Sequence, residues 1–299
     1  MRKMTSIQAV KAKYPNRRHY LQLCLLLLAY ISITNCSTVA SSVGKGWADN
    51  LSTAINEQDD PKTVKDGAPA YLLMIDSLIA GDPENVSLLS AGANLYSSYA
   101  SVFVDDPLRA KRMATKAWGF AVRAMCSKHK SACELHTRHF DEYTAFIQTL
   151  DDAPLLYTYG TTWASYIQIN ADDWNAIADL SKVVVTMEQV QKLDDTHDNG
   201  GVHLYLGVLA SLIPPALGGK PEVARMHFER AIELSKGQNL MAKVIFAEKY
   251  ARMTFNRELH DDILKNVVKA DPRKPGMTLM NTLAQAKAKT LLKSADEYF

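Results

Sequence analysis

Five residues that can bind metals or form disulfides lie close together in this chain: Cys126, His129, Cys133, His136 and His139. They contain two Cys-x2-His spacings, and thiolate and imidazole ligands at such density can bind zinc. In a chain that is exported, as the N-terminus indicates, a cysteine pair across a helix-helix turn is more simply a disulfide. We therefore expect the Cys126–Cys133 disulfide and no metal, with a zinc site or two free thiols as the alternatives.

The N-terminal segment has the features of an export signal. It carries six basic residues and no acidic one, followed by an apolar run from Leu21 to Ile33. That run is shorter than the roughly 20 residues that a membrane span needs. It ends in Ile33-Thr34-Asn35-Cys36, which resembles the lipobox of bacterial lipoproteins, although Asn35 stands where glycine or alanine is usual. The resemblance implies cleavage before Cys36 and lipidation of Cys36. Ordinary secretion or retention of the segment is the alternative.

These observations divide the chain into three parts. We expect a lipoprotein signal peptide at 1–35, a lipid-anchored flexible leader at 36–60 and a folded domain at 61–299. Ser37, directly after the cysteine, resembles a signal for the outer membrane, so we expect the protein at the periplasmic face of the envelope, anchored to the membrane by lipid.

Removal of the signal changes the charge of the chain. The full sequence is formally +2, but the six lost basic residues leave 28 basic against 32 acidic residues, a net charge of −4. No cluster of Lys and Arg interleaved with aromatic residues remains, so the composition gives no support for nucleic-acid binding.

The stretch Gly200–Asn239 predicts two helices and a long connection between them. The first helix follows Gly200-Gly201, runs from His203 to Ile213 and ends at Pro214-Pro215. The second is expected from Pro221 to about Lys236, with Gly237 as a left-handed C-terminal cap.

Small and large apolar residues alternate on one face of that second helix, at Ala224, Phe228 and Ala231. This is the second-helix pattern of the tetratricopeptide (TPR) repeat, in which a partner helix approaches closely. The connection is roughly five residues longer than in the ordinary repeat. A shift of 114 positions reproduces the same stretched pattern, and it pairs Ala93 with Gly207, Pro107 with Pro221, Ala110 with Ala224, Ala114 with Phe228, and Ala117 with Ala231. We interpret this as an internal repeat.

The rest of the chain also has helical periodicity, with no convincing strand pattern. We expect helices at 67–80, 107–124, 174–193, 240–253, 257–270 and 278–299, and one that begins after Asp151-Asp152. Trp163 and Trp174 could stack a ligand, but packing between helices is the commoner role at such spacing. The predicted fold is all-α: a TPR-like solenoid of paired antiparallel helices with a C-terminal capping helix.

The sequence contains no motif that would define an enzyme. Gly-x-Ser-x-Gly, His-Glu-x-x-His and phosphate-loop patterns are all missing from it. We therefore expect neither catalysis nor a cofactor.

The central stretch and its continuation resemble the TatT family, the TPR lipoproteins associated with tripartite ATP-independent periplasmic (TRAP) transporters. Three segments carry most of the resemblance: His203-Leu204-Tyr205-Leu206-Gly207, Gly218-Gly219-Lys220-Pro221-Glu222, and His227-Phe228-Glu229-Arg230-Ala231-Ile232-Glu233-Leu234. The Gly-Gly-x-Pro-Glu connection is the specific part, because generic TPR proteins lack it.

What the resemblance implies is a periplasmic accessory component of a TRAP transporter. It implies a helical scaffold that engages the substrate-binding subunit and assembles as a homotrimer. It also implies a small hydrophobic or amphipathic ligand, with a pore through each subunit as its route. A TPR lipoprotein that scaffolds an outer-membrane or envelope assembly is the alternative function.

The candidate partner-binding and ligand-binding residues lie in the central unit. Two are polar groups on its first helix, and the others form the connection: His203, Tyr205, Pro214, Pro215, Gly218, Gly219, Lys220 and Pro221. For His203 a satisfied packing role is the competing interpretation. For the connection the competing interpretation is a purely structural turn.

Overall fold

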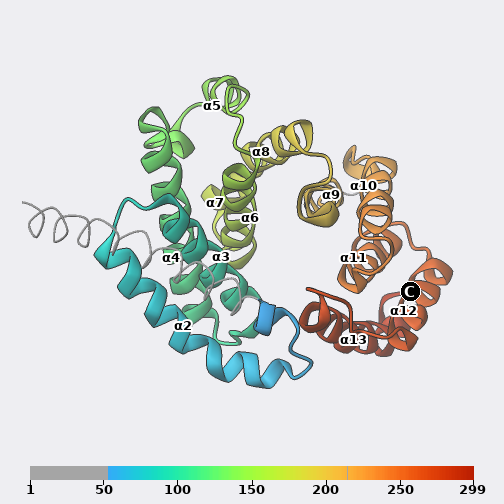
Figure 1. Ribbon diagram of the computed structural model, residues 1–299. Helices are drawn as coiled ribbons and strands as arrows, with labels where there is room; N and C mark the ends of the chain where they lie inside the picture. Colours follow the sequence, from blue (N-terminus) through green and yellow to red (C-terminus); the bar gives the residue numbers. More distant parts are fainter. Residues whose placement is uncertain (1–52, 214) are drawn as a thin grey trace, which may run out of the picture. The chain divides into compact units, whose positions relative to one another are not determined.

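The computed structural model describes residues 53–213 and 215–299, and Ile55–Phe299 form one packed unit (Figure 1). The described residues contain helices and turns and no strand, so the all-α prediction is confirmed for them. The signal segment, Cys36 and Pro214 lie outside the described residues. None of the described helices is both long and apolar enough to cross a membrane.

The helices follow one another with short connections. Their bounds are α2 (Pro61–Gly81), α3 (Val86–Phe103), α4 (Pro107–Lys128), α5 (Phe140–Ile147), α6 (Ala153–Ile169), α7 (Trp174–Ala178), α8 (Leu180–Leu193), α9 (His197–Ala210), α10 (Pro221–Leu234), α11 (Leu240–Ile245), α12 (Arg257–Lys269), α13 (Thr278–Lys293) and α14 (Ala295–Tyr298). Short 3-10 turns are η1 (Lys130–Ala132), η2 (Leu135–Thr137) and η3 (Pro215–Leu217), and η4 (Phe246–Ala251) is a π-helix.

Packing joins these helices in pairs: α3 with α4, α6 with α8, α9 with α10, and α12 with α13. Only residues 104–106 separate α3 from α4, so these two helices must run antiparallel. Successive pairs also touch, through α4 against α6 and α8 against α9 (Figure 1). This order of helix pairs is compatible with a TPR-like solenoid, which stays a prediction.

The two helices that the internal repeat relates, α4 and α10, begin at matching residues and bury matching residues. Both α4 and α10 begin at the predicted prolines, Pro107 and Pro221. The apolar residues that a shift of 114 positions superimposes are all buried, namely Ala110, Ala114 and Ala117 in α4 and Ala224, Phe228 and Ala231 in α10. The sequence pattern therefore marks the faces that these helices bury.

In three helix pairs, a glycine of the first helix lies against the second helix. A methyl group added at each would come within 3.0 Å of a partner side chain: Gly92 against Phe120, Gly160 against Met187, and Gly207 against Phe228. Side chains at these positions would push the helices apart. The close approach that the Ala-rich pattern predicts is thus present in three pairs.

The first folded helix begins earlier than expected. We predicted 67–80, whereas α2 starts at Pro61 because Asp60 caps it, accepting a hydrogen bond from the backbone of Lys62 at 3.0 Å. Pro69 lies inside the helix and cannot donate to the carbonyl of Lys65. The Tyr99 hydroxyl donates to that carbonyl instead, at 3.1 Å. A tertiary contact therefore stabilises a helix that the local sequence disfavours.

The expected helix over 174–193 was also wrong as a single element. It is divided at Asp179 into α7 and α8. Trp163 packs in the core with 1% of its surface exposed, stacked on Trp118 with ring centroids 4.7 Å apart. Trp174 is 82% exposed, so the packing role predicted for it was wrong.

Three further boundaries differ from the expectation. The first helix of the central unit ends at Ala210 rather than Ile213, and Gly200 lies inside it. The helix expected over 240–253 changes from α to π geometry at Phe246. The last helix is interrupted at Ser294.

The packed unit extends N-terminally past the predicted boundary at 61. The Glu57 carboxylate accepts hydrogen bonds from the Gly276 backbone and, at 2.9 Å, from the Thr278 hydroxyl. Arg273 pairs with Asp59 at 3.3 Å, and α2 touches α13. The two ends of the unit are therefore in contact.

Candidate functional site

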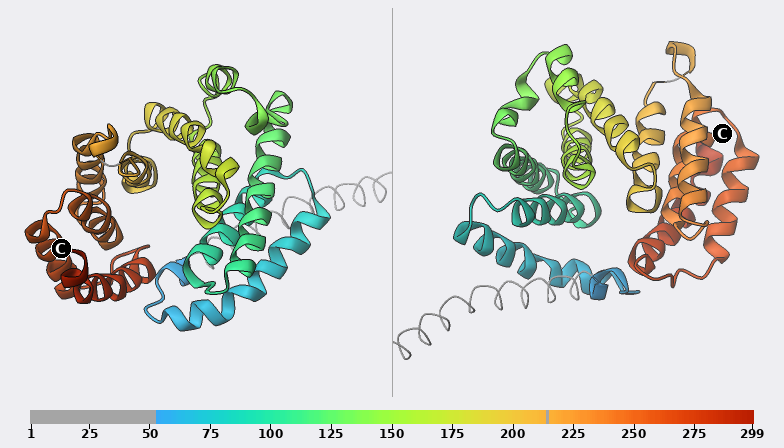
Figure 2. Two further views of the ribbon diagram at one scale, coloured as in Figure 1. Left: turned by 180° about the vertical axis from the view of Figure 1, so that it is seen from behind. Right: turned by 45° about the horizontal axis from the view of Figure 1, so that its top comes forward.

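The connection between α9 and α10, residues 211–220, is the most exposed part of the central unit that we singled out. It projects beyond the ends of both helices (Figure 2). Leu212 is 47% and Ile213 is 54% exposed, and Pro215, Gly218 and Lys220 are exposed as well. Exposed apolar side chains beside such a turn are typical of surfaces that contact other molecules.

The geometry of this connection explains its glycine and its proline. Gly218 has φ +89°, and its backbone N–H donates to the Pro215 carbonyl at 3.0 Å. A side chain there would meet open space, so the left-handed backbone is what requires glycine. Pro221 occupies the first turn of α10, where no backbone donor is needed. Gly219 lies between these two constraints and is partly exposed.

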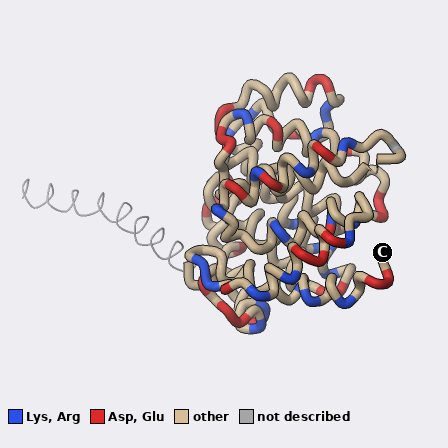
Figure 3. Tube along the Cα trace, turned by 90° about the vertical axis from the view of Figure 1, so that its right-hand side faces the viewer, with Lys and Arg blue, Asp and Glu red and all other residues tan. Residues whose placement is uncertain are grey.

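The adjoining face of α10 carries mixed charges and two exposed apolar residues, Val223 and Met226. Arg225 pairs with Glu229 at 2.7 Å along the helix. Figure 3 shows acidic and basic residues interspersed on the side of the unit that it presents. This face is open to solvent and is formed by Glu222, Arg225, Met226, Glu229, Arg230 and Glu233.

His203 does not project into solvent. It is 3% exposed, and its Nδ1 lies 2.9 Å from Nδ1 of His227 on α10. Its Nε2 lies 2.8 Å from Oδ1 of Asp195, whose other oxygen binds Arg230 at 2.8 Å. A polar chain thus joins the segment before α9 and the middle of α9 to α10.

The direction of the hydrogen bonds in this chain follows from the carboxylate. Asp195 can only accept, so neutral His203 donates from Nε2 and keeps a lone pair on Nδ1. His227 must then donate its Nδ1 proton to His203. Arg230 holds the pKa of Asp195 below its usual range. Burial, followed by the neighbouring His203, lowers the pKa of His227 to about 4.

The competing interpretation of His203 as a satisfied packing residue agrees with this geometry. Both of its ring nitrogens are occupied, and neither faces a ligand. Tyr205 is partly buried on the same helix and touches Tyr157 of α6. The sequence did not predict the pairing with His227, because nothing local links two histidines 24 positions apart. Their placement on the two paired helices was the one available signal.

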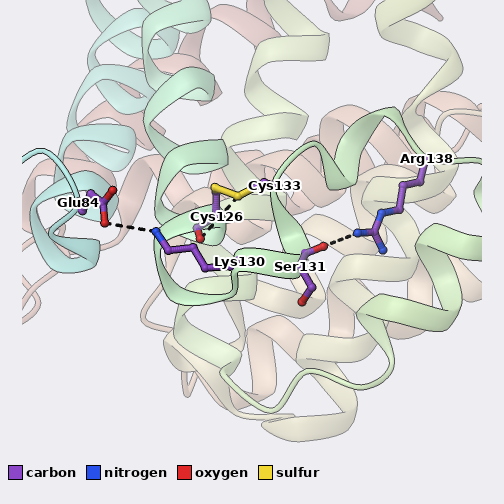
Figure 4. The surroundings of a disulfide bond; sticks show 6 residues. All are labelled: Glu84, Cys126, Lys130, Ser131, Cys133 and Arg138. Carbon is purple, nitrogen blue, oxygen red and sulfur yellow. Dashed lines mark hydrogen bonds and ion pairs between the residues drawn. A yellow bond between two sulfur atoms is a disulfide. The ribbon is translucent and has the colours of Figure 1, made fainter.

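A disulfide joins Cys126, near the end of α4, to Cys133, in the segment between α4 and α5 (Figure 4). Lys130 forms an ion pair with Glu84 at 3.2 Å, and Arg138 donates to the Ser131 carbonyl. Of the histidines in this segment, His136 packs edge-on against Trp118. No group of three metal-binding side chains that could hold an ion occurs in the described residues.

The structure is that of an all-helical protein built from packed helix pairs. Residues 57–299 match the family model described as TRAP transporter T-component, and the chain belongs to that family. Comparison with curated proteins gave no match. Membership makes the protein an accessory component of a TRAP transporter and implies a location in the periplasm or envelope.

Proposed function

We propose that this chain is a lipid-anchored TPR scaffold that binds the substrate-binding subunit of its TRAP transporter through residues 211–220 and the adjoining face of α10. The observation that carries the proposal is the exposed pair Leu212 and Ile213 beside the family's Gly-Gly-x-Pro-Glu connection. An exposed apolar pair beside a turn can anchor a partner by being buried against it.

The membrane side of the proposal rests on the N-terminal segment. Lipidation of Cys36 would hold the scaffold at the periplasmic face of the envelope, in the outer membrane by the resemblance of Ser37 to a sorting signal. The resemblance to the family further supports a homotrimer and a small hydrophobic ligand. Native mass spectrometry of the mature chain tests both, with three copies and an added small mass as the expected result.

The test of the partner is co-purification of the mature chain, with Cys36→Ser to prevent lipidation, with the TRAP substrate-binding subunit from the same cell envelope. We expect Leu212→Ser/Ile213→Ser to weaken the complex about tenfold or more, because the apolar anchors are lost. Leu73→Ser/Leu108→Ser is the control, since these two leucines are exposed as well, at 71% on α2 and 69% on α4. That control should bind as the unchanged chain does.

Recovery of envelope-assembly proteins without the TRAP subunit would contradict the proposal and favour a scaffold for envelope assembly. Equal loss of binding in both double variants would place the contact outside residues 211–220.

A further inference from the structure

The exposed side of α4 is strongly basic. The helix contains six basic residues and no acidic one, although the chain without its signal segment is formally −4. Most of these charges are exposed, and 3.6 residues per turn place positions 108, 109, 112, 116 and 123 on one side of the helix. We call this side the basic face of α4, and its residues are Leu108, Arg109, Arg112, Lys116 and Arg123.

The charges of the basic face do not stabilise the helix that carries them. Arg109, Arg112 and Arg123 form no ion pair with any residue that the structure describes. Arg112 lies three positions after Arg109 and four before Lys116, where like charges repel one another. Lys116 alone in this row has a carboxylate partner, on α2. The basic face therefore has a cost within the protein, and a partner outside the protein would offset it.

The helix that the internal repeat relates to α4 shows that the fold does not require this charge. On α10 the buried residues match those of α4, but the exposed side carries both signs. Arg225 pairs with Glu229 at 2.7 Å, and Arg230 pairs with Glu233 at 2.9 Å, each within the helix. Opposite charges one turn apart are the common arrangement on a solvated helix. The uniform charge is therefore specific to α4.

An apolar side chain lies at the N-terminal end of the basic face. Leu108 is 69% exposed, beside Arg109 and one turn before Arg112. Gly119, further along the helix, is exposed, and a methyl group added there would meet nothing within 4 Å. Long basic side chains around an apolar one suit the interface of a bilayer, because the cations contact anionic headgroups while the apolar group enters below them.

The start of α4 lies near the point where the chain enters the packed unit. Lys65, in the second turn of α2, pairs with Asp105 at 2.9 Å, directly before α4. Sixteen residues separate Cys36 from Thr53, and a chain of that length spans at most about 55 Å. Lipidation of Cys36, as proposed above, would therefore keep the basic face within reach of a bilayer.

We propose that the basic face of α4 contacts an anionic phospholipid surface. The headgroups supply the charge that the three unpaired arginines lack, and the bilayer interface accepts Leu108. A lipid surface is favoured over an acidic protein because the face adjoins the entry of the anchored leader. Only this last step rests on the proposed lipid anchor, and the contact is separate from residues 211–220.

The experiment is flotation of the mature chain carrying Cys36→Ser with two kinds of vesicle. One kind is phosphatidylcholine alone, and the other contains about one third phosphatidylglycerol. We expect the chain to float with the anionic vesicles at low salt, to be released from them at high salt, and not to float with the neutral ones. The net charge of the mature chain opposes this binding, so a local basic surface is needed for it.

Two double variants locate the contact. Arg109→Gln/Arg112→Gln removes two charges that pair with no described carboxylate, and we expect it to weaken binding to the anionic vesicles about tenfold or more. Lys289→Gln/Lys293→Gln is the matched control, because it removes the same charge from exposed positions on α13. The control should bind as the unchanged chain does.

The proposal is overturned if the chain does not bind the anionic vesicles at low salt, if neutral vesicles bind it equally well, or if both double variants lose the same affinity. It is supported if only the α4 variant loses binding. The transporter proposal is tested by recovery of a protein partner, so failure of one test leaves the other result intact.

Discussion

Among single residues, buried His227 is one whose protonation should change the stability of the protein. The pKa of His227 is lowered to about 4, first by burial and then by its neighbour, whereas an unfolded histidine titrates at about 6.5. Between these two pKa values the unfolded chain binds a proton that the folded chain does not. Stability is therefore present above pH 6.5 and is lost as the pH falls toward 4.

We expect this loss to be on the order of 2 to 3 kcal/mol in unfolding free energy. The measurement is urea denaturation at pH 7.5, 5.5 and 4.5. His227→Asn keeps an amide donor near the position of Nδ1 and cannot titrate, so its stability should fall less over the same range. Identical pH profiles for the variant and the unchanged chain would show that another group titrates.

Cys126 and Cys133 give a second prediction at this scale. A disulfide that closes so short a segment restricts the unfolded chain modestly, so Cys126→Ala/Cys133→Ala should lower the unfolding free energy by about 2 kcal/mol. Denaturation with and without reductant measures this loss of unfolding free energy. Reductant should lower the stability of the unchanged chain but not that of the double variant. Two titratable thiols in unreduced protein, or one bound zinc per chain, would contradict the disulfide.

At the scale of elements, close packing between paired helices can be tested at their glycines. Gly207→Ala would place a methyl group 2.9 Å from the fully buried Phe228 ring. Although alanine favours helices, we expect a loss of about 1 to 2 kcal/mol in unfolding free energy because the ring cannot move aside. Gly119→Ala is the control, since nothing lies within 4 Å of its added methyl group.

Thermal or chemical denaturation distinguishes the two glycine variants. Gly119→Ala should raise stability by about 0.5 to 1 kcal/mol, through helix propensity alone. A stabilising Gly207→Ala would mean that α9 and α10 can separate at little cost.

Elements were predictable where their signals are local. Asp152 and Asn239 cap α6 and α11 through their side chains, and Gly237 takes the predicted left-handed backbone at φ +68°. The missed start of α2 also had a local signal, the Asp60 cap, whereas the continuation of that helix past Pro69 depends on a tertiary contact. The hydroxyl of Tyr99, far along the chain, is what supports α2 around Pro69.

In the candidate site, too, features with a local sequence signal were predictable and contacts between distant residues were not. Proline and glycine predicted a connection from Pro214 to Pro221, because backbone geometry follows from residue type, but α9 ends three residues earlier than predicted, at Ala210. The histidine chain needs side chains from two helices, 24 positions apart in sequence. Helical periodicity indicates which face of a helix is buried, but it does not identify the residue on another helix that this face meets.

For the whole unit, the contact between its two ends determines whether its first and last helices are independent. Glu57 accepts hydrogen bonds from Gly276 and Thr278 at the start of α13, a helix that has no side-chain cap of its own. The carboxylate satisfies the backbone N–H of Gly276, just before the helix, and its charge matches the positive end of the helix dipole. An N-terminal residue thus ties down the start of a C-terminal helix.

Glu57→Ala should therefore loosen both ends together. We expect a loss of about 1 to 2 kcal/mol in unfolding free energy and faster amide hydrogen exchange in residues 55–60 and 274–281. Glu188→Ala is the matched control, because Glu188 is exposed on α8, away from both ends. Faster exchange at 55–60 alone would show that α13 is capped without Glu57. Faster exchange in both segments would show that the ends stabilise each other, so that truncation of the N-terminal segment would weaken the C-terminal helices as well.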